Sequence, residues 1–138
     1  MFHANIIRVA LPVLFAFVGA CEKAQAQTCN MEGNIKTCTE RVGNLATIIK
    51  SDPSGMVLQW GVNSSDRHRD AMNAVALIGT TMTILAPFSK QDERADALVK
   101  IIGEADKGHD TSVLLGDFSW KAVVSGISLS VIAVRVAH

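Results

Sequence analysis

The sequence lacks an excess of charge of either sign. Its 138 residues include 13 lysines and arginines and 13 aspartates and glutamates, so the formal net charge at pH 7 is zero. A protein that holds nucleic acid through its phosphates usually carries a strong basic surplus. We therefore expect no nucleic-acid partner.

The sequence also lacks the short motifs that mark common catalytic and cofactor sites. It contains no P-loop and no GxGxxG, HExxH, GxSxG or CxxC pattern. None of its serines can be assigned a histidine and an acidic partner from the sequence. We therefore predict a protein that is not an enzyme, with no catalytic residue, no cofactor and no metal site.

The N-terminal segment, residues 1–26, is typical of an export signal. Arg8 and the amino terminus are positively charged, and the short apolar run Val9–Ala20 follows them. Ala24–Ala26 forms an A-x-A cleavage site. The alternatives are an uncleaved membrane anchor and a segment that directs no export. The sequence therefore favours a protein of the periplasm or cell envelope.

Cysteine is scarce, since the chain has only Cys21, Cys29 and Cys38. Val18–Cys21 resembles a bacterial lipobox, in which Cys21 would be lipidated and would anchor the mature protein to a membrane. Cleavage after Ala26 would instead remove Cys21. Either route leaves Cys29 and Cys38 as an even pair in an oxidising compartment, so we predict a disulfide between them.

Residues 27–138 are long enough for one domain, and their apolar spacing favours an all-α fold. Within Met31–Lys50, apolar residues recur at alternating intervals of four and three, which predicts a helix with one apolar face. Ser89–Lys107 has a similar stripe, with acidic residues near its start. Met56–Val62 fits either a helical turn or a short strand. We expect a small bundle or hairpin of about four helices.

Two apolar blocks, residues 66–88 and 112–137, are predicted as helices on either side of the amphipathic segment. The uncharged run Ala71–Phe88 lies at the lower end of the roughly 17–25 residues that a bilayer span needs. It therefore fits either a weak membrane span or a helix that other helices bury. The second block is rich in valine and isoleucine, so strand structure is an alternative there.

Six residues near the borders of these blocks are candidates for membrane or partner contacts. Tryptophan suits a membrane interface, and basic side chains that flank an apolar run can extend towards it. The alternatives are tryptophans that anchor a core and charges that stay in water. The six candidates are Trp60, Arg67, Arg69, Trp120, Lys121 and Arg135.

This layout supports two functional hypotheses. The first is a small exported bacterial cell-envelope protein with a structural, assembly or membrane-interaction role, such as a secretion, conjugation or phage-related component. The second is a soluble periplasmic helical module for binding, inhibition or immunity. Both imply a protein partner or self-association, and the first adds embedding in the inner membrane.

Overall fold

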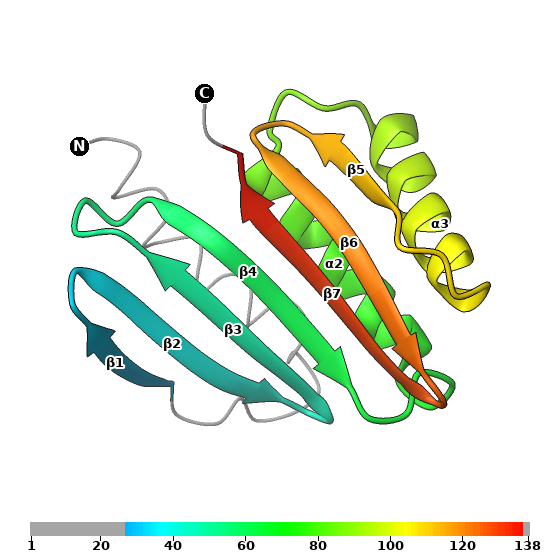
Figure 1. The fold of residues 1–138 in the computed structure, drawn as a ribbon, viewed down its shortest axis with the longest axis horizontal. Coiled ribbons are helices and arrows are strands. Elements are labelled where there is room, and N and C mark those ends of the chain that lie inside the picture. Colours follow the sequence, from blue (N-terminus) through cyan, green and yellow to red (C-terminus); the bar gives the residue numbers. More distant parts are fainter. Residues whose placement is uncertain (1–26, 137–138) are drawn as a thin grey trace.

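The computed structural model describes residues 27–136, so the predictions of an export signal and of lipidation at Cys21 lie outside the described residues. Residues 27–136 form one seven-stranded antiparallel sheet with two helices on one face (Figure 1). The strands are β1 (Thr28–Glu32), β2 (Ile35–Val42), β3 (Leu45–Ser51), β4 (Val57–Ser64), β5 (Ser112–Leu115), β6 (Phe118–Ser125) and β7 (Ser128–Arg135), and the helices are α2 (Ala71–Leu85) and α3 (Gln91–Asp106).

The strand order β1-β2-β3-β4-β7-β6-β5 results from two antiparallel meanders that meet in the middle of the sheet. Strands β1 to β4 form the first meander, β5 to β7 form the second, and both helices lie between them in the sequence. The two meanders join where β4 pairs with β7, from Gln59 opposite Val134 to Ser64 opposite Leu129. This pairing makes one continuous sheet from two distant halves of the chain.

The predicted all-α bundle of about four helices is wrong, because the described residues form mainly β-sheet. Met31–Lys50 contains the end of β1, all of β2 and most of β3. Its spacing imitates a helix because Cys38 and Val42 lie four apart on one face of β2, as Leu45 and Ile49 do on β3. The two-residue turn between the strands supplies the interval of three from Val42 to Leu45, whereas Ile35 and Cys38, also three apart, lie on opposite faces of β2.

The predicted apolar helix at residues 112–137 is also wrong, since this block contains β5, β6 and β7. Its buried residues alternate along the strands, as Phe118, Trp120 and Ala122 show on β6. Alternation is the pattern of a sheet with one buried face. The strand reading suggested by valine and isoleucine was therefore the correct one, and Met56–Val62 falls mostly within β4.

The other two helix predictions are confirmed. Helix α2 lies within residues 66–88 and ends shortly before Pro87, which cannot continue it. Helix α3 lies within Ser89–Lys107. The apolar side of α2, including Leu77 and Met82, is buried in the protein. No helix in the described ranges combines the length and apolarity that crossing a membrane requires.

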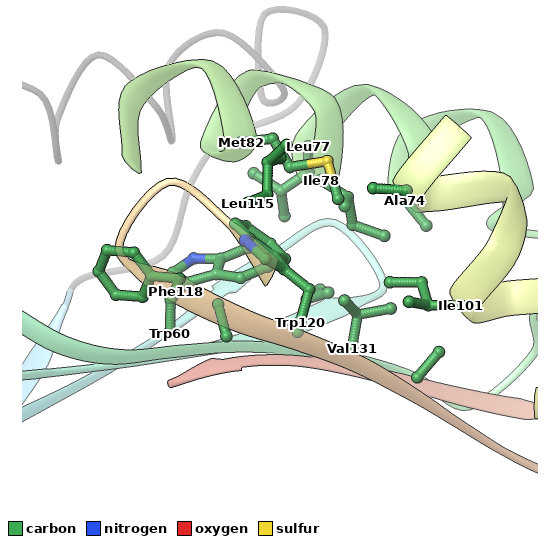
Figure 2. Close-up of a cluster of buried hydrophobic side chains, with 14 of the residues drawn as sticks. Trp60, Ala74, Leu77, Ile78, Met82, Ile101, Leu115, Phe118, Trp120 and Val131 are labelled. Atoms are coloured by element: carbon green, nitrogen blue, oxygen red, sulfur yellow. The ribbon is translucent and has the colours of Figure 1, made fainter. Parts of the chain in front are cut away.

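The core between the helices and the sheet is built around two tryptophans (Figure 2). Trp60 of β4 and Trp120 of β6 are 2% and 0% exposed, and their ring centroids are 6.0 Å apart. Both lie opposite Ala133 of β7, one from each side, so a small residue separates two large ones. Leu77 and Met82 of α2 lie over the rings. Tilted aromatic pairs at this separation are favourable.

We expect Trp120→Ala to lower the free energy of unfolding by about 3–5 kcal/mol, because it leaves a cavity in the core. Urea unfolding followed by circular dichroism measures this change. Val99→Ala is the matched control, because Val99 is 73% exposed on α3, and it should change stability by less than about 0.5 kcal/mol. Equal stability of the two variants would contradict the placement of Trp120.

Candidate functional site

The sheet face opposite α2 and α3, called here the open face, has no described helix or strand over it (Figure 1). Side chains alternate along each strand, so the neighbours of the core residues point to this face. Ile48, Gly61 and Ile132 lie side by side across β3, β4 and β7. The next row along the same strands consists of Ala46, Asn63 and Ser130.

A hollow of about 490 Å³ opens on this face around Gly61, and we call it the Gly61 hollow. The glycine leaves the floor low between the two isoleucines of its row. A Cβ atom at this position would lie 3.1 Å from Cγ2 of Ile48 and 3.6 Å from the carbonyl oxygen of Val131. The volume lies within the range that is typical of binding pockets. The lining includes Thr28, Thr39, Arg41, Ile48, Asn63 and Ile132.

The rim of the Gly61 hollow is polar and positively charged at Arg41. The Nδ2 group of Asn63 donates a hydrogen bond of 2.7 Å to Oγ of Ser130. Arg41 lies in the same row, on β2, and its exposed side chain forms no ion pair with residues 27–136. The neighbouring Glu40 is also among the residues that line the hollow, although its side chain alternates to the other face, and burial raises the pKa of its carboxyl. An apolar floor beside an available guanidinium suits an apolar group with a nearby carboxylate.

Sequence reasoning missed both Gly61 and Arg41. A glycine inside the apolar run MVLQWGV is a signal for a strand that something approaches closely. Gly61 carried that signal, but a glycine indicates a close approach only when its segment is known to be a strand. Arg41 carried no local signal, because a single arginine in a mixed segment is ordinary.

The six residues predicted as membrane or partner contacts do not gather in one place. Both tryptophans lie in the core, and each basic residue contacts an acidic residue of the same chain. Lys121, at the β6 position opposite Ile132, lies on the open face. The ion pairs are Arg67–Asp106 at 2.6 Å, Arg69–Asp70 at 2.9 Å, Lys121–Asp110 at 2.5 Å and Arg135–Asp117 at 3.4 Å.

Arg135 is held by three groups at the end of β7. Its Nε donates a hydrogen bond of 2.8 Å to the carbonyl oxygen of Val57, and its Nη1 lies near Asp117. Its guanidinium carbon also stands 4.6 Å from the centre of the Phe118 ring, within the range of a cation–π contact. Arg135 therefore ties β7 to the start of β4 and to the β5–β6 turn.

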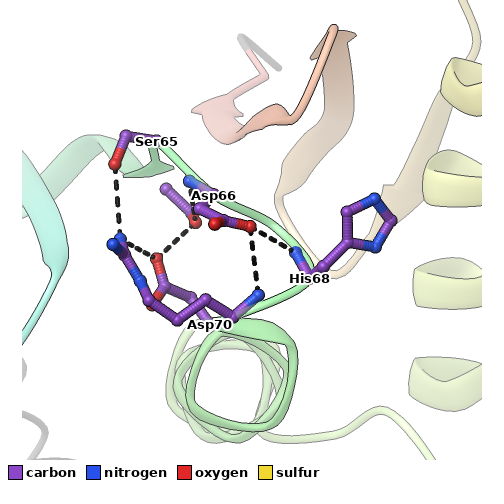
Figure 3. Close-up of polar contacts among 6 residues, drawn as sticks. Ser65, Asp66, His68 and Asp70 are labelled. Carbon is purple, nitrogen blue, oxygen red and sulfur yellow. Dashed lines mark hydrogen bonds and ion pairs between the residues drawn. The ribbon is translucent and has the colours of Figure 1, made fainter.

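Arg69 belongs to a compact polar group that joins β4 to α2 (Figure 3). The carboxylate of Asp70 is 3% exposed, accepts two hydrogen bonds from Arg69 and one of 2.6 Å from Oγ of Ser64. The hydrogen bonds from Arg69, then those from Ser64 and Asn44, hold the pKa of Asp70 below its ordinary value. Asp66 Oδ1 accepts the backbone N–H of Arg69 in the same loop. The loop is therefore fixed by a buried charge.

The predicted disulfide between Cys29 and Cys38 is present and joins β1 to β2. The two cysteines lie directly opposite each other in the strand pair, with Cα atoms 4.1 Å apart. The next pair is Thr28 opposite Thr39, and both threonines line the Gly61 hollow. The disulfide therefore holds the outer wall of the hollow to the rest of the sheet. It is also consistent with an oxidising, exported environment.

Among the residues that the structure describes, no three histidine, cysteine, aspartate or glutamate side chains converge as metal ligands would. Nδ1 of His109 lies 2.7 Å from Oε2 of Glu104 at the end of α3, and this contact lowers the pKa of Glu104. The pair bridges the last turn of α3 and the residues after it, on the helix side of the protein.

No protein-family model, curated protein or solved structure matches the chain. The Gly61 hollow combines an apolar floor with a polar rim that includes Arg41.

Replacing both Cys29 and Cys38 by serine should lower the free energy of unfolding by about 2–3 kcal/mol, because the unfolded chain gains freedom. Urea unfolding of the oxidised protein and of the double variant measures the difference. A reductant should destabilise the unaltered protein by a similar amount and leave the double variant unchanged. A double variant that responds to reductant would contradict this prediction.

Asp70→Asn should lower the free energy of unfolding at neutral pH by about 1–3 kcal/mol, because it removes the charge that Arg69 and Ser64 bind. The folded pKa of Asp70 lies below its ordinary 3.8. The contribution of Asp70 to the free energy of unfolding is therefore complete at pH values above the ordinary pKa of 3.8 and is lost as the pH falls through the lower, folded pKa. Unfolding curves of the two proteins should converge in acid. Asp96→Asn, at an exposed site on α3, is the control and should track the unaltered protein.

Proposed function

We propose that this protein is an exported, non-enzymatic binding module that docks a partner protein on the open face of its sheet. The observation that carries the proposal is the Gly61 hollow, an apolar depression beside an arginine that has no acidic partner within residues 27–136. Protein interfaces commonly centre on a side chain that fills such a depression, surrounded by a polar rim.

The partner's chemistry follows from the lining. Ile48 and Ile132 flank a floor that would accept one apolar side chain. Arg41 would bind a carboxylate next to that side chain, and arginine is enriched among residues that dominate binding energy. The hydroxyl groups of Thr28 and Thr39 offer hydrogen bonds at the rim. We therefore propose an apolar residue beside an aspartate or glutamate as the partner's anchor.

The cellular setting is part of the proposal. A cross-strand disulfide persists in an oxidising compartment, and the chain begins with a segment typical of an export signal. We place the protein in the periplasm or cell envelope, free or tethered there. The hypothesis of a membrane-embedded assembly component rested on two apolar helices. One of the two predicted segments, residues 112–137, contains strands β5, β6 and β7 instead.

The proposal is tested by photo-crosslinking in the cells that make the protein. A benzophenone amino acid at Thr39, on the rim of the hollow, should give one discrete adduct, whose partner mass spectrometry identifies. Arg41→Glu and Gly61→Ala should each lower the yield of this adduct about tenfold at subsaturating partner, because each removes about 1.4 kcal/mol or more of binding energy. Lys36→Glu is the matched control, since Lys36 is exposed on the same strand but on the other face.

A benzophenone at Val99 on α3 should not give the same adduct. Two results would count against the proposal. One is the absence of any protein adduct at Thr39. The other is an adduct that Lys36→Glu and Arg41→Glu weaken equally, since this would mean that the hollow takes no specific part.

A further inference from the structure

We propose that β1 is a self-association edge, at which a second copy of the chain adds its own β1 antiparallel to the first. The Gly61 hollow plays no part in the backbone pairing of this edge. The inference rests on the two ends of the sheet, which differ in how they are protected, and on the direction in which the backbone groups of β1 point.

The two edges of the sheet are unlike. The β5 edge is short, and α3 runs alongside it (Figure 1). The β1 edge pairs with β2 alone among the described strands, and all five of its residues are exposed. Edge strands are commonly protected by proline, lysine or a bulge. The sequence TCNME of β1 contains neither proline nor lysine, its one charged residue, Glu32, is the last of the strand, and its pairing with β2 is regular.

The backbone of β1 presents hydrogen-bonding groups outward at Cys29 and Met31. Directly opposed residues of an antiparallel pair stand about 5.5 Å apart when they bond to each other and about 4.5 Å apart when they do not. The Cα atoms of Cys29 and Cys38 are 4.1 Å apart, so this pair is of the second kind. Bonded and non-bonded pairs alternate, so Cys29 and Met31 direct their N–H and C=O groups away from β2.

These outward groups define one favourable register for a second copy. If Cys29 lies opposite Met31 of the second copy, and Met31 opposite its Cys29, then both residues of each strand form bonded pairs. Asn30 then lies opposite its own equivalent on the two-fold axis, where the two amides can hydrogen-bond. Glu32 lies opposite Thr28, so no like charges face each other. This self-complementarity favours a second copy over an unrelated strand.

The disulfide makes β1 a suitable template. It links Cys29 to the sheet, so the edge is ordered before it meets a partner. Less conformational freedom is then lost on association. In the resulting pair the two sheets become continuous across β1. The two-fold axis stands perpendicular to the sheet, so both open faces and both Gly61 hollows lie on the same side.

Sedimentation velocity of the purified, oxidised protein between about 1 µM and 1 mM tests the proposal. We expect a reversible monomer–dimer equilibrium. Met31→Pro should raise the dissociation constant at least about tenfold, because proline removes an outward N–H that β2 does not use. Met31→Ala is the matched control and should dimerise like the unaltered protein, since it keeps the backbone donor.

A charge pair at Asn30 tests the register. Asn30→Lys and Asn30→Glu should each weaken self-association, because each places like charges opposite one another at the axis. An equimolar mixture of the two should restore a dimer tighter than either variant forms alone. Near-ultraviolet circular dichroism of the buried tryptophans verifies that each variant is folded, and the Asn30 pair decides the outcome if Met31→Pro misfolds.

A protein that remains monomeric over the whole range overturns the proposal. So does a dimer that Met31→Pro and Asn30→Lys leave unchanged, because its interface must then lie elsewhere. A mixture of the Asn30 variants that associates no better than either alone rejects the register.

Discussion

The pairing of β4 with β7 is the interaction on which the rest of the structure depends. It places Ala133 between Trp60 and Trp120 on the helix side, so the two large rings meet over a small residue. On the other side it places Gly61 between Ile48 and Ile132, so a depression forms where a side chain would otherwise stand. One strand pair thus creates the core on one face and the candidate binding site on the other.

Charge is used in two ways around this sheet. Arg67, Arg69 and Arg135 bind acidic groups of their own chain and fix loops or strand ends. Asp70 is the acidic partner that is most deeply buried, and its carboxylate accepts hydrogen bonds from Arg69 and Ser64. Such a group stabilises only when every partner is in place. Arg41, by contrast, has no acidic partner within residues 27–136 and lines the Gly61 hollow, so its guanidinium is the one placed to meet a ligand there.

The sequence was informative where structure is local. Helices α2 and α3 were predicted because each has an apolar stripe within one segment, with Pro87 after α2 and acidic residues in the first turn of α3. The disulfide was predicted from cysteine parity and compartment. The strands were missed because two hairpins with short turns reproduce a helical spacing. The Gly-Asn pairs at residues 33–34 and 43–44 were the overlooked signal, since glycine at the first turn position adopts the positive φ of a tight hairpin.

The candidate site could not be predicted, because it is a product of register. Gly61 and Ile132 become neighbours only when β4 pairs with β7, and nothing in either segment specifies the other. The same is true of the two tryptophans, which were proposed as contact residues and lie in the core. The face that each strand turns inward depends on the register of the whole sheet, which neither tryptophan's own segment specifies.

The separation of the two meanders in the sequence has a kinetic consequence. β1 to β4 are consecutive and joined by short turns, so their contacts close small loops. Pairing β4 with β7 must instead close a loop that contains both helices. The conformational entropy of that loop is lost before the contacts between β4 and β7 stabilise the chain. Without that pairing β4 would be an edge strand, and Trp60 would lack Ala133 as its neighbour. A chain in which this pairing is slow exposes the unpaired edge of β4 to aggregation. The second meander covers that edge when β7 pairs with β4.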